Sequence, residues 1–294
     1  MNASLTYLAS LTVLLLAPIS LAQPAPPAAP KLDYAGTLAA PLEPTRLVTY
    51  RKAGDRELHL HVFNPEGWKA SDKRACFLSV HGGGWVNGAP RRQYPFAAHF
   101  AAKGMVGISV EYRLLKKDNV TPFDCVADGR SAIRYIKEHA AELGIDAEKI
   151  VANGGSAGAH VAAGMAMFDG VDNPGDNLKI DPKPAALVLH YPVIDTSTAG
   201  YGNKACGPKW KDISPLHQVK NGTPPTILFH GTGDQTTPFA GAKAFDAAMH
   251  EAGNRCELVI HPGGKHGYFM FEKELYDEVE KKTEAFLQSL KLID

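Results

Sequence analysis

The feature of this sequence that most constrains its fold is an alternation of short apolar runs with longer stretches of helical pattern. Apolar runs of this length suit strands that are buried on both faces of a parallel sheet. They occupy residues 76–80, 106–110, 150–153, 186–189, 226–229 and 258–261. Helical patterns lie at residues 126–143, 157–168, 240–251 and 271–290. The repeated order of strand and helix predicts an α/β fold with a mostly parallel central sheet and helices on both faces.

Two further strands are expected ahead of this repeat. Residues 47–50 and 58–63 alternate in polarity around Gly54, which predicts a leading antiparallel hairpin at one edge of the sheet. The second of these strands carries His59 and His61, a spacing that could chelate a metal from one strand face. No third ligand is evident in the sequence, so we expect no metal site there and two histidines on an exposed edge strand.

The amino-terminal residues have the composition of an export signal. The first 22 residues contain no Lys, Arg, Asp or Glu, and an apolar run at 13–17 is followed by the small residues before Gln23. We expect residues 1–22 to be a signal peptide cleaved after Ala22, which makes the protein secreted or periplasmic. The alternative is an uncleaved membrane anchor, but Pro18 and several polar residues leave little apolar length for a span.

The remaining chain divides by composition into two parts. Residues 23–44 are rich in Pro and Ala at their start and predict an extended segment, whereas residues 45–294 suit one α/β domain. Positive and negative residues balance at 31 each. No basic patch or charge run is present, so neither nucleic acid nor an anionic membrane surface is expected as a partner.

A nucleophile motif lies between an apolar run and an apolar helical stretch. The segment Gly154-Gly155-Ser156-Ala157-Gly158 matches G-x-S-x-G, a strand-to-helix turn so tight that glycine is needed on both sides. This turn lifts a serine hydroxyl above the sheet edge, so Ser156 is the candidate nucleophile. The alternative is a glycine-rich turn with an incidental serine, and the strand before it and helix after it favour the catalytic interpretation.

A second motif supplies candidate hydrogen-bond donors. The run His81-Gly82-Gly83-Gly84-Trp85 follows an expected strand and leaves backbone N–H groups open to a ligand. With the N–H of Ala157, those of Gly83 and Gly84 are expected to bind the oxyanion of a tetrahedral intermediate. A phosphate-binding loop is the competing interpretation, but no P-loop or dinucleotide-binding pattern accompanies these glycines.

A serine nucleophile needs a base that is oriented by an acid. His266 follows the last expected strand and is flanked by glycines, so it is the candidate base, whereas His261 lies within that strand and is assigned a structural role. Asp234 follows the preceding strand and is the candidate acid, with Asp195 as the alternative. The chain order serine, aspartate, histidine is the order of the α/β-hydrolase fold.

These motifs resemble a known group of enzymes. The HGGGW and GGSAG motifs, Tyr112-Arg113-Leu114 and the closing His-Gly resemble bacterial esterases related to hormone-sensitive lipase. The block at 230–238, HGTGDQTTP, departs from that group and is closer to secreted bacterial esterases of the feruloyl and acetylxylan type. The resemblance covers about residues 45–290, and it does not extend to the helical cap of the lipase relatives, because the chain has little room for one.

The resemblance implies cofactor-free hydrolysis of a carboxylic ester through an acyl-enzyme. A short-acyl ester, free or linked to plant polysaccharide, is the expected substrate. Trp85 and Tyr268 adjoin catalytic segments and are expected to bind it, with residues 196–212 as one wall of the pocket. A peptidase or amidase with the same triad and a catalytically silent binding module are the alternatives.

The four cysteines leave one further question open. Export makes a disulfide possible, and Cys76 and Cys256 belong to strands that this fold places apart. Any disulfide is therefore expected between Cys125 and Cys206; the alternative is four free thiols.

Overall fold

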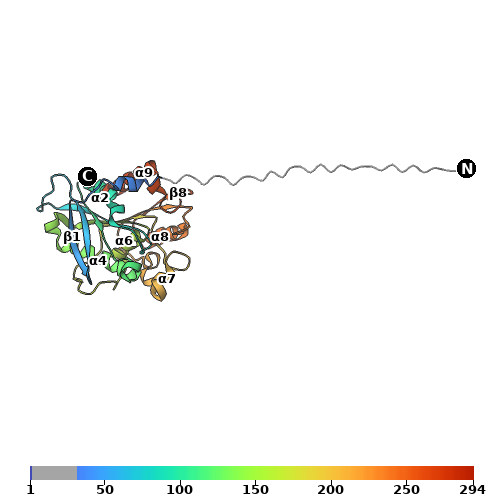
Figure 1. The fold of residues 1–294 in the computed structure, drawn as a ribbon, viewed down its shortest axis with the longest axis horizontal. Coiled ribbons are helices and arrows are strands. Elements are labelled where there is room, and N and C mark those ends of the chain that lie inside the picture. Colours follow the sequence, from blue (N-terminus) through green and yellow to red (C-terminus); the bar gives the residue numbers. More distant parts are fainter. Residues whose placement is uncertain (2–31) are drawn as a thin grey trace. The chain divides into compact units, whose positions relative to one another are not determined.

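The computed structural model describes Met1 and residues 32–294, so the expected signal peptide and its cleavage site lie outside the described residues (Figure 1). Residues 32–294 build an eight-stranded sheet in the order β1-β2-β4-β3-β5-β6-β7-β8. The strands are β1 (Arg46–Ala53), β2 (Arg56–Phe63), β3 (Arg74–Val80), β4 (Val106–Val110), β5 (Ile145–Gly155), β6 (Ala186–His190), β7 (Thr226–Gly231) and β8 (Cys256–His261).

The pairing confirms the predicted sheet. Strands β1 and β2 form an antiparallel hairpin, β2 pairs antiparallel with β4, and all remaining pairs are parallel. The prediction for His59 and His61 was wrong in one respect. Their strand β2 lies between β1 and β4 and is not an edge strand, because β4 covers the side of the hairpin that the sequence pattern leaves open.

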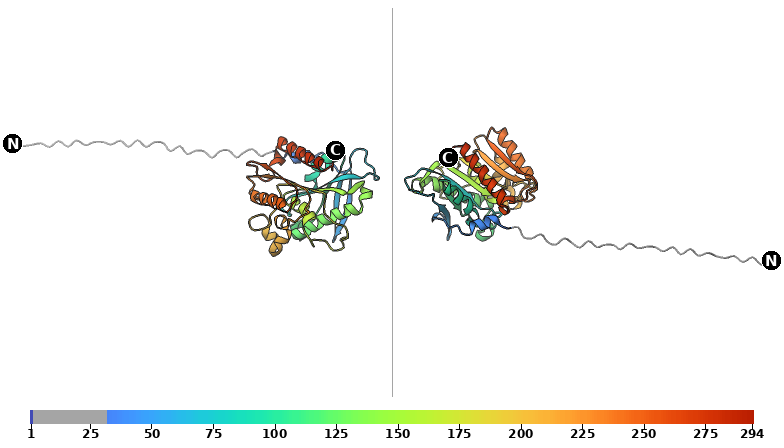
Figure 2. Two further views of the ribbon diagram at one scale, coloured as in Figure 1. Left: turned by 180° about the vertical axis from the view of Figure 1, so that it is seen from behind. Right: turned by 90° about the horizontal axis from the view of Figure 1, so that it is seen from above.

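Helices cover both faces of the sheet, as predicted (Figure 2). One face packs against α1 (Tyr34–Ala39), α2 (Tyr94–Ala102) and α9 (Lys273–Ser289). The other packs against α4 (Pro122–Glu138), α6 (Ala157–Met167) and α8 (Phe239–Glu251). The short helices are α3 (Leu115–Asp118), α5 (Ala140–Leu143), α7 (Asn203–Cys206), η1 (Pro90–Gln93), η2 (Gly207–Ile213), η3 (Pro215–Gln218) and η4 (Tyr268–Phe271).

Three helices differ from the sequence expectation. The helix expected over 126–143 is two helices, because α4 ends at Glu138 and α5 continues to the left-handed Gly144 (φ 68°). Helix α2 was not predicted. Helix α1 lies inside the stretch expected to be extended, and its Ala35 and Ala39 are buried against the domain.

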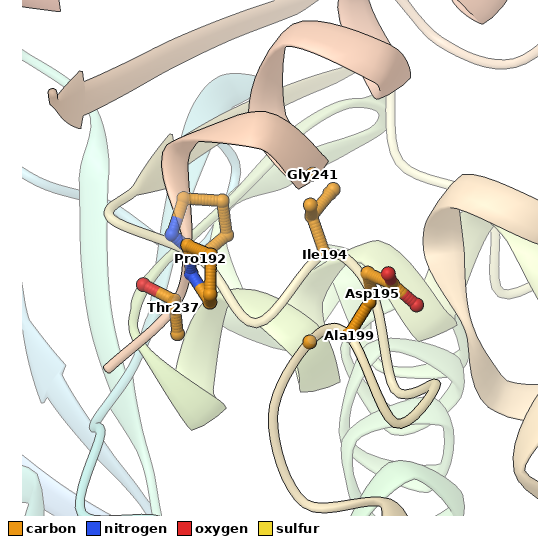
Figure 3. A pocket seen from close by; sticks show the side chains of 8 residues that line it. Pro192, Ile194, Asp195, Ala199, Thr237 and Gly241 are labelled. Carbon is orange, nitrogen blue, oxygen red and sulfur yellow. The ribbon is translucent and has the colours of Figure 1, made fainter. Parts of the chain in front are cut away.

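The segment between β6 and β7 contains only short helices and lies beside α8. Figure 3 shows Ile194 pointing toward Gly241 near the start of α8. A Cβ atom on Gly241 would lie 3.2 Å from Cγ2 of Ile194, so the small residue permits this close approach. The segment is thereby held against the carboxyl end of the sheet.

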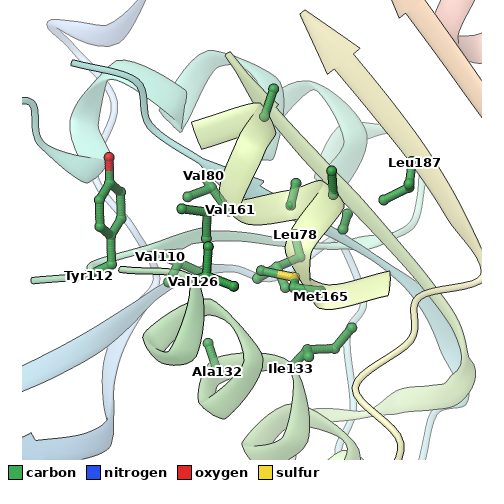
Figure 4. Close-up of a cluster of buried hydrophobic side chains, with 14 of the residues drawn as sticks. Leu78, Val80, Val110, Tyr112, Val126, Ala132, Ile133, Val161, Met165 and Leu187 are labelled. Carbon is green, nitrogen blue, oxygen red and sulfur yellow. The ribbon is translucent and has the colours of Figure 1, made fainter. Parts of the chain in front are cut away.

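Helix α6 is held in the largest cluster of buried side chains (Figure 4). Its Val161 and Met165 pack between the sheet and α4. A Cβ atom on Gly129 of α4 would lie 2.5 Å from Val161, so the two helices approach closely only because this position is glycine. This packing fixes the start of α6, where Ser156 lies.

All four cysteines are free and buried, so the structure has the alternative of four free thiols and not the Cys125–Cys206 disulfide. The Sγ atom of Cys125 lies 3.1 Å from the carbonyl oxygen of Arg113 and is directed into the domain. Among the described helices, none has the length and apolar character needed to cross a membrane.

Candidate active site

Ser156 occupies a tight turn between β5 and α6. Its backbone has φ 56° and ψ −121°, a conformation that costs free energy for a residue with a side chain. A Cβ atom on Gly154 would lie 2.4 Å from the backbone of Gly158, and one on Gly158 would lie 2.1 Å from the carbonyl oxygen of Val80. Glycine is therefore required on both sides, and the turn presents the hydroxyl at the carboxyl end of the sheet.

The imidazole of His266 joins the serine to Asp234. Its Nε2 lies 2.9 Å from Oγ of Ser156, and its Nδ1 lies 2.8 Å from Oδ2 of Asp234. The three side chains follow β5, β7 and β8, whose carboxyl ends meet at one edge of the parallel sheet. This arrangement can accept the hydroxyl proton on one ring nitrogen while a carboxylate holds the other.

Short hydrogen bonds hold the Asp234 carboxylate. The backbone N–H groups of Thr236 and Thr237 donate to Oδ1 at 2.8 and 2.9 Å, and the Thr237 hydroxyl donates to Oδ2 at 2.9 Å. Burial alone would raise the pKa of Asp234, but the hydrogen bonds from His266 and Thr237 outweigh it and hold the pKa below its usual value. The group therefore stays ionised at neutral pH. The sequence reasoning did not identify Thr237.

The glycine run after β3 lies beside the serine turn. A Cβ atom on Gly82 would lie 2.7 Å from the carbonyl oxygen of Gly155 and 3.2 Å from Cβ of Ser156. The N–H groups of Gly83, Gly84 and Ala157 donate no hydrogen bond to any residue from 32 to 294. These three N–H groups remain available to a ligand next to the Ser156 hydroxyl.

A cavity of about 410 Å³ opens over the serine. Its lining comes from the glycine run and from segments distant in sequence: Gly82, Gly83, Gly84, Asn87, Gly88, Arg92, Gln93, Ser156, Tyr191, Tyr201, Thr236, His266, Gly267, Met270 and Phe271. Most of the residues contributed by other segments were not foreseen, because no local motif marks them.

Trp85 and Tyr268, which were expected to bind substrate, do not line this cavity. Trp85 is 1% exposed and packs behind Tyr201, with ring centroids 5.6 Å apart. Tyr268 stacks on His261 at 4.5 Å. Tyr201, in the segment 196–212, does line the cavity, as does Tyr191 after β6.

A second group of Ser, His and Asp side chains lies in the segment between β6 and β7. Nδ1 of His217 lies 2.9 Å from Oγ of Ser214 and 3.9 Å from Oδ1 of Asp195. Ser214 is fully buried and accepts a hydrogen bond from the N–H of Thr196. Asp195, the alternative acid, is therefore associated with His217 and not with His266.

The two histidines of β2 take part in a hydrogen-bonded cluster with Glu111 and Tyr94. Nδ1 of His59 lies 3.1 Å from Glu111, and Nδ1 of His61 lies 2.6 Å from the Tyr94 hydroxyl. Burial would raise the pKa of Glu111, but hydrogen bonds from His61 and His59 lower it to about 2. Within residues 32–294, no cluster of three His, Cys, Asp or Glu side chains is suited to hold a metal ion.

The fold is that of an α/β-hydrolase. The apo structure of Thermogutta terrifontis esterase 2 superposes with a TM-score of 0.82 and 38% sequence identity, covering 87% of this chain and 98% of that one. The chain belongs to the BD-FAE family, whose model matches residues 60–249.

Two curated relatives with esterase names match this chain over about half of their own length. The esterase LipQ of Mycobacterium tuberculosis is 28% identical over an alignment of 219 positions, which covers 68% of this chain and 51% of LipQ. The acetylxylan esterase of Xylanibacter ruminicola is 23% identical over an alignment of 234 positions, which covers 75% of this chain and 45% of that protein. The chain thus spans about half the length of these two relatives.

Proposed function

We propose that this protein is a serine hydrolase of carboxylic esters, with Ser156 as nucleophile, His266 as base and Asp234 as the acid that orients the base. The observation that carries the proposal is the His266 ring, which contacts the serine hydroxyl through Nε2 and the carboxylate through Nδ1. The strained turn at Ser156 and the unused N–H groups beside it support the same function.

The reaction would proceed in two halves. Oγ of Ser156 attacks the ester carbonyl carbon while its proton passes to Nε2 of His266, and the N–H groups of Gly83, Gly84 and Ala157 stabilise the oxyanion. When the intermediate collapses, the C–O bond to the alcohol breaks and His266 returns the proton to the leaving oxygen. Water then attacks the acyl-enzyme with His266 as base, which releases the acid and restores the serine.

Short acyl groups are the substrates that the cavity suits. Its volume is about 410 Å³ and glycines form much of the wall near Ser156, so an acetyl to butyryl group fits more readily than a long chain. A related structure, Thermogutta terrifontis esterase 2, has been solved with propionate and with butyrate bound. The acetylxylan esterase among the relatives supports polysaccharide-linked acetyl esters as natural substrates.

The site of action would be outside the cytoplasm. The uncharged first 22 residues support a signal peptide, and because α1 packs against the domain, the catalytic domain would comprise residues 32–294 and not 45–294 alone. N-terminal sequencing of the protein recovered from the expressing cells tests this: a mature chain that begins at Gln23 is expected, and an intact Met1 would contradict export by cleavage.

One substrate panel tests the function. We expect hydrolysis of p-nitrophenyl acetate and butyrate, weak hydrolysis of the palmitate ester and none of a peptide anilide. Ser156→Ala should lower the rate by about three or more orders of magnitude, because losing a nucleophile removes the covalent route. Faster cleavage of the anilide would favour an amidase, and activity that survives in Ser156→Ala would refute the assignment. Acetylated xylan, assayed in parallel, tests the polysaccharide-linked substrate.

A further inference from the structure

The described residues that line the cavity over Ser156 carry positive charge without negative charge. Arg92 is its one permanently charged lining residue, and no Asp or Glu is among the described residues of the lining. Arg92 belongs to η1, the short helix that leads into α2, and none of the proposed catalytic steps uses it. The role of a cation that faces the cavity without a carboxylate in the described lining is therefore open to explanation by a ligand.

The Arg92 side chain is positioned by an ion pair with Asp33, which lies outside the cavity lining. Its Nη1 donates to Oδ2 of Asp33, and Oδ1 of the same carboxylate accepts a hydrogen bond of 3.0 Å from the N–H of Gly36 at the start of α1. Burial would raise the pKa of Asp33, but the hydrogen bond from Arg92 lowers it, so the two groups are an ion pair. Asp33 does not line the cavity. It therefore positions the guanidinium without covering the side that faces a ligand.

Most of the guanidinium donors remain unused. Arginine presents five N–H donors in a planar fork, and Nη1 makes the one side-chain hydrogen bond that Arg92 has within residues 32–294. The charge also acts inside the cavity. Burial raises the pKa of the Tyr191 hydroxyl and Arg92 opposes that rise, and the Tyr191 ring lies 4.9 Å from the ring of His266. The positive charge of Arg92 therefore acts on a residue that lies next to the proposed base, His266.

Gln93 adds an amide to the same part of the cavity. It lines the cavity although it is only 3% exposed, and its amide nitrogen donates no hydrogen bond to a described residue. The amide oxygen is buried and also lacks a partner within the described chain. A carboxylate can accept a hydrogen bond from the amide nitrogen, whereas the buried oxygen is itself an acceptor and makes no contribution to binding an anion. Two adjacent residues therefore offer donors to one acceptor-rich group.

We propose that Arg92 and Gln93 bind a carboxylate on the ester substrate, distinct from the scissile ester group. The planar fork of arginine matches the two oxygens of a carboxylate, and an ionised carboxylate accepts hydrogen bonds without donating any. The preferred substrates are accordingly anionic: acylated hydroxy acids, or half-esters of dicarboxylic acids. This inference rests on the proposed esterase function and specifies the substrate class of the same site.

Two matched substrate pairs test the proposal at pH 7. One pair carries the charge on the alcohol half, 4-acetoxybenzoate against 4-acetoxybenzamide. The other carries it on the acyl half, methyl hydrogen succinate against methyl pentanoate. We expect kcat/KM to favour the charged member of at least one pair by about fivefold, a modest factor because the Arg92 side chain is 42% exposed and screened by water. The pair that shows the preference identifies the half of the substrate that Arg92 binds.

Variants at Arg92, Gln93 and Arg91 distinguish an effect of the charge at residue 92 from a general disturbance of the structure. Arg92→Gln should abolish the preference, Arg92→Lys should retain part of it, and Gln93→Glu should reverse it by repelling the carboxylate. Arg91→Gln removes the same charge from the neighbouring residue, which pairs with Glu43 outside the cavity, and should leave the preference unchanged. Raising the salt concentration should weaken the preference in the wild type, because salt screens an exposed charge.

The outcomes distinguish the two proposals. Hydrolysis of the neutral esters without any charged preference, or a preference that Arg92→Gln leaves intact, overturns the carboxylate site and leaves the esterase function standing. Failure to hydrolyse any of the four esters or p-nitrophenyl acetate overturns the esterase function itself. If Arg92→Gln does not fold, Arg92→Lys and the salt dependence decide the question.

Discussion

Two groups of Ser, His and Asp side chains lie in this domain, and they differ in how the imidazole is used. His266 spans its partners, with Ser156 on Nε2 and Asp234 on Nδ1. His217 turns one nitrogen, Nδ1, toward both of its partners. A ring that holds its carboxylate on one nitrogen can take a proton on the other, whereas a ring that meets both groups on one side cannot relay a proton between them.

The serines of the two groups, Ser156 and Ser214, also differ in their access to a ligand. Ser156 lines a cavity and has unused N–H groups beside it, while Ser214 is fully buried and accepts a hydrogen bond from the backbone of Thr196. Residue identity is therefore not sufficient for catalysis. The serine must face a cavity that can hold the carbonyl group of a substrate, and the imidazole must contact the serine with one nitrogen and the carboxylate with the other.

The largest expected difference concerns the two aspartates. Asp234→Asn should lower kcat by about three to four orders of magnitude, because the ring loses the carboxylate that fixes its tautomer and stabilises its charged form. Asp195→Asn should change kcat by no more than about twofold, since it touches no reacting group. Steady-state assays with p-nitrophenyl acetate measure both, and the reverse order would transfer the role of the acid to Asp195.

A smaller effect is expected from the hydroxyl that supports Asp234. Thr237→Val removes the 2.9 Å hydrogen bond to Oδ2 and should lower kcat by about fivefold. Hydrogen bonds from Thr237 help to depress the pKa of Asp234, so this carboxyl should take up its proton at a higher pH in the variant, and the stability that its ionised form contributes should be lost at a higher pH on acidification. The matched control is Ser197→Ala, which removes the corresponding 2.9 Å bond to Asp195. Urea unfolding at a series of acidic pH values measures this, and an identical loss of stability with pH in wild type and Thr237→Val would contradict the role given to this hydroxyl.

The smallest effect on activity is expected at the second serine. Ser214→Ala leaves the Thr196 N–H without its acceptor, so the free energy of unfolding should fall by about 1–3 kcal/mol while kcat changes by no more than about twofold. Ser156→Ala should do the opposite, removing activity without loss of stability. Urea unfolding beside esterase assays compares the two, and a large loss of activity in stable, folded Ser214→Ala would show that the second group acts in catalysis.

The sheet and the serine turn could be predicted because their signals are local. Each strand is a short apolar run, and the glycines around Ser156 are required by contacts of about 2 Å that any larger residue would make. Helix α2 was missed because its sequence, YPFAAHFAA, is apolar on nearly every side and has no helical period.

The cavity wall could not be predicted from neighbours in sequence. Trp85 adjoins Gly84, yet its positive φ of 61° accompanies a ring packed into the interior. Tyr268 is two residues from His266 but begins η4 and stacks on His261. Tyr191, Tyr201 and Arg92 reach the cavity through tertiary packing, which no local motif records.

The spacing of the three strands that carry the site has a consequence for folding. The contact between Ser156 and His266 joins residues 110 positions apart, and it needs β5, β6, β7 and β8 to be paired in order. Contacts of such long sequence separation are slow to form, because the entropy of closing the loop is lost before the contact stabilises the chain. Recovery of hydrolytic activity during refolding should therefore lag behind recovery of helical circular dichroism, which makes catalysis a reporter for completion of the sheet.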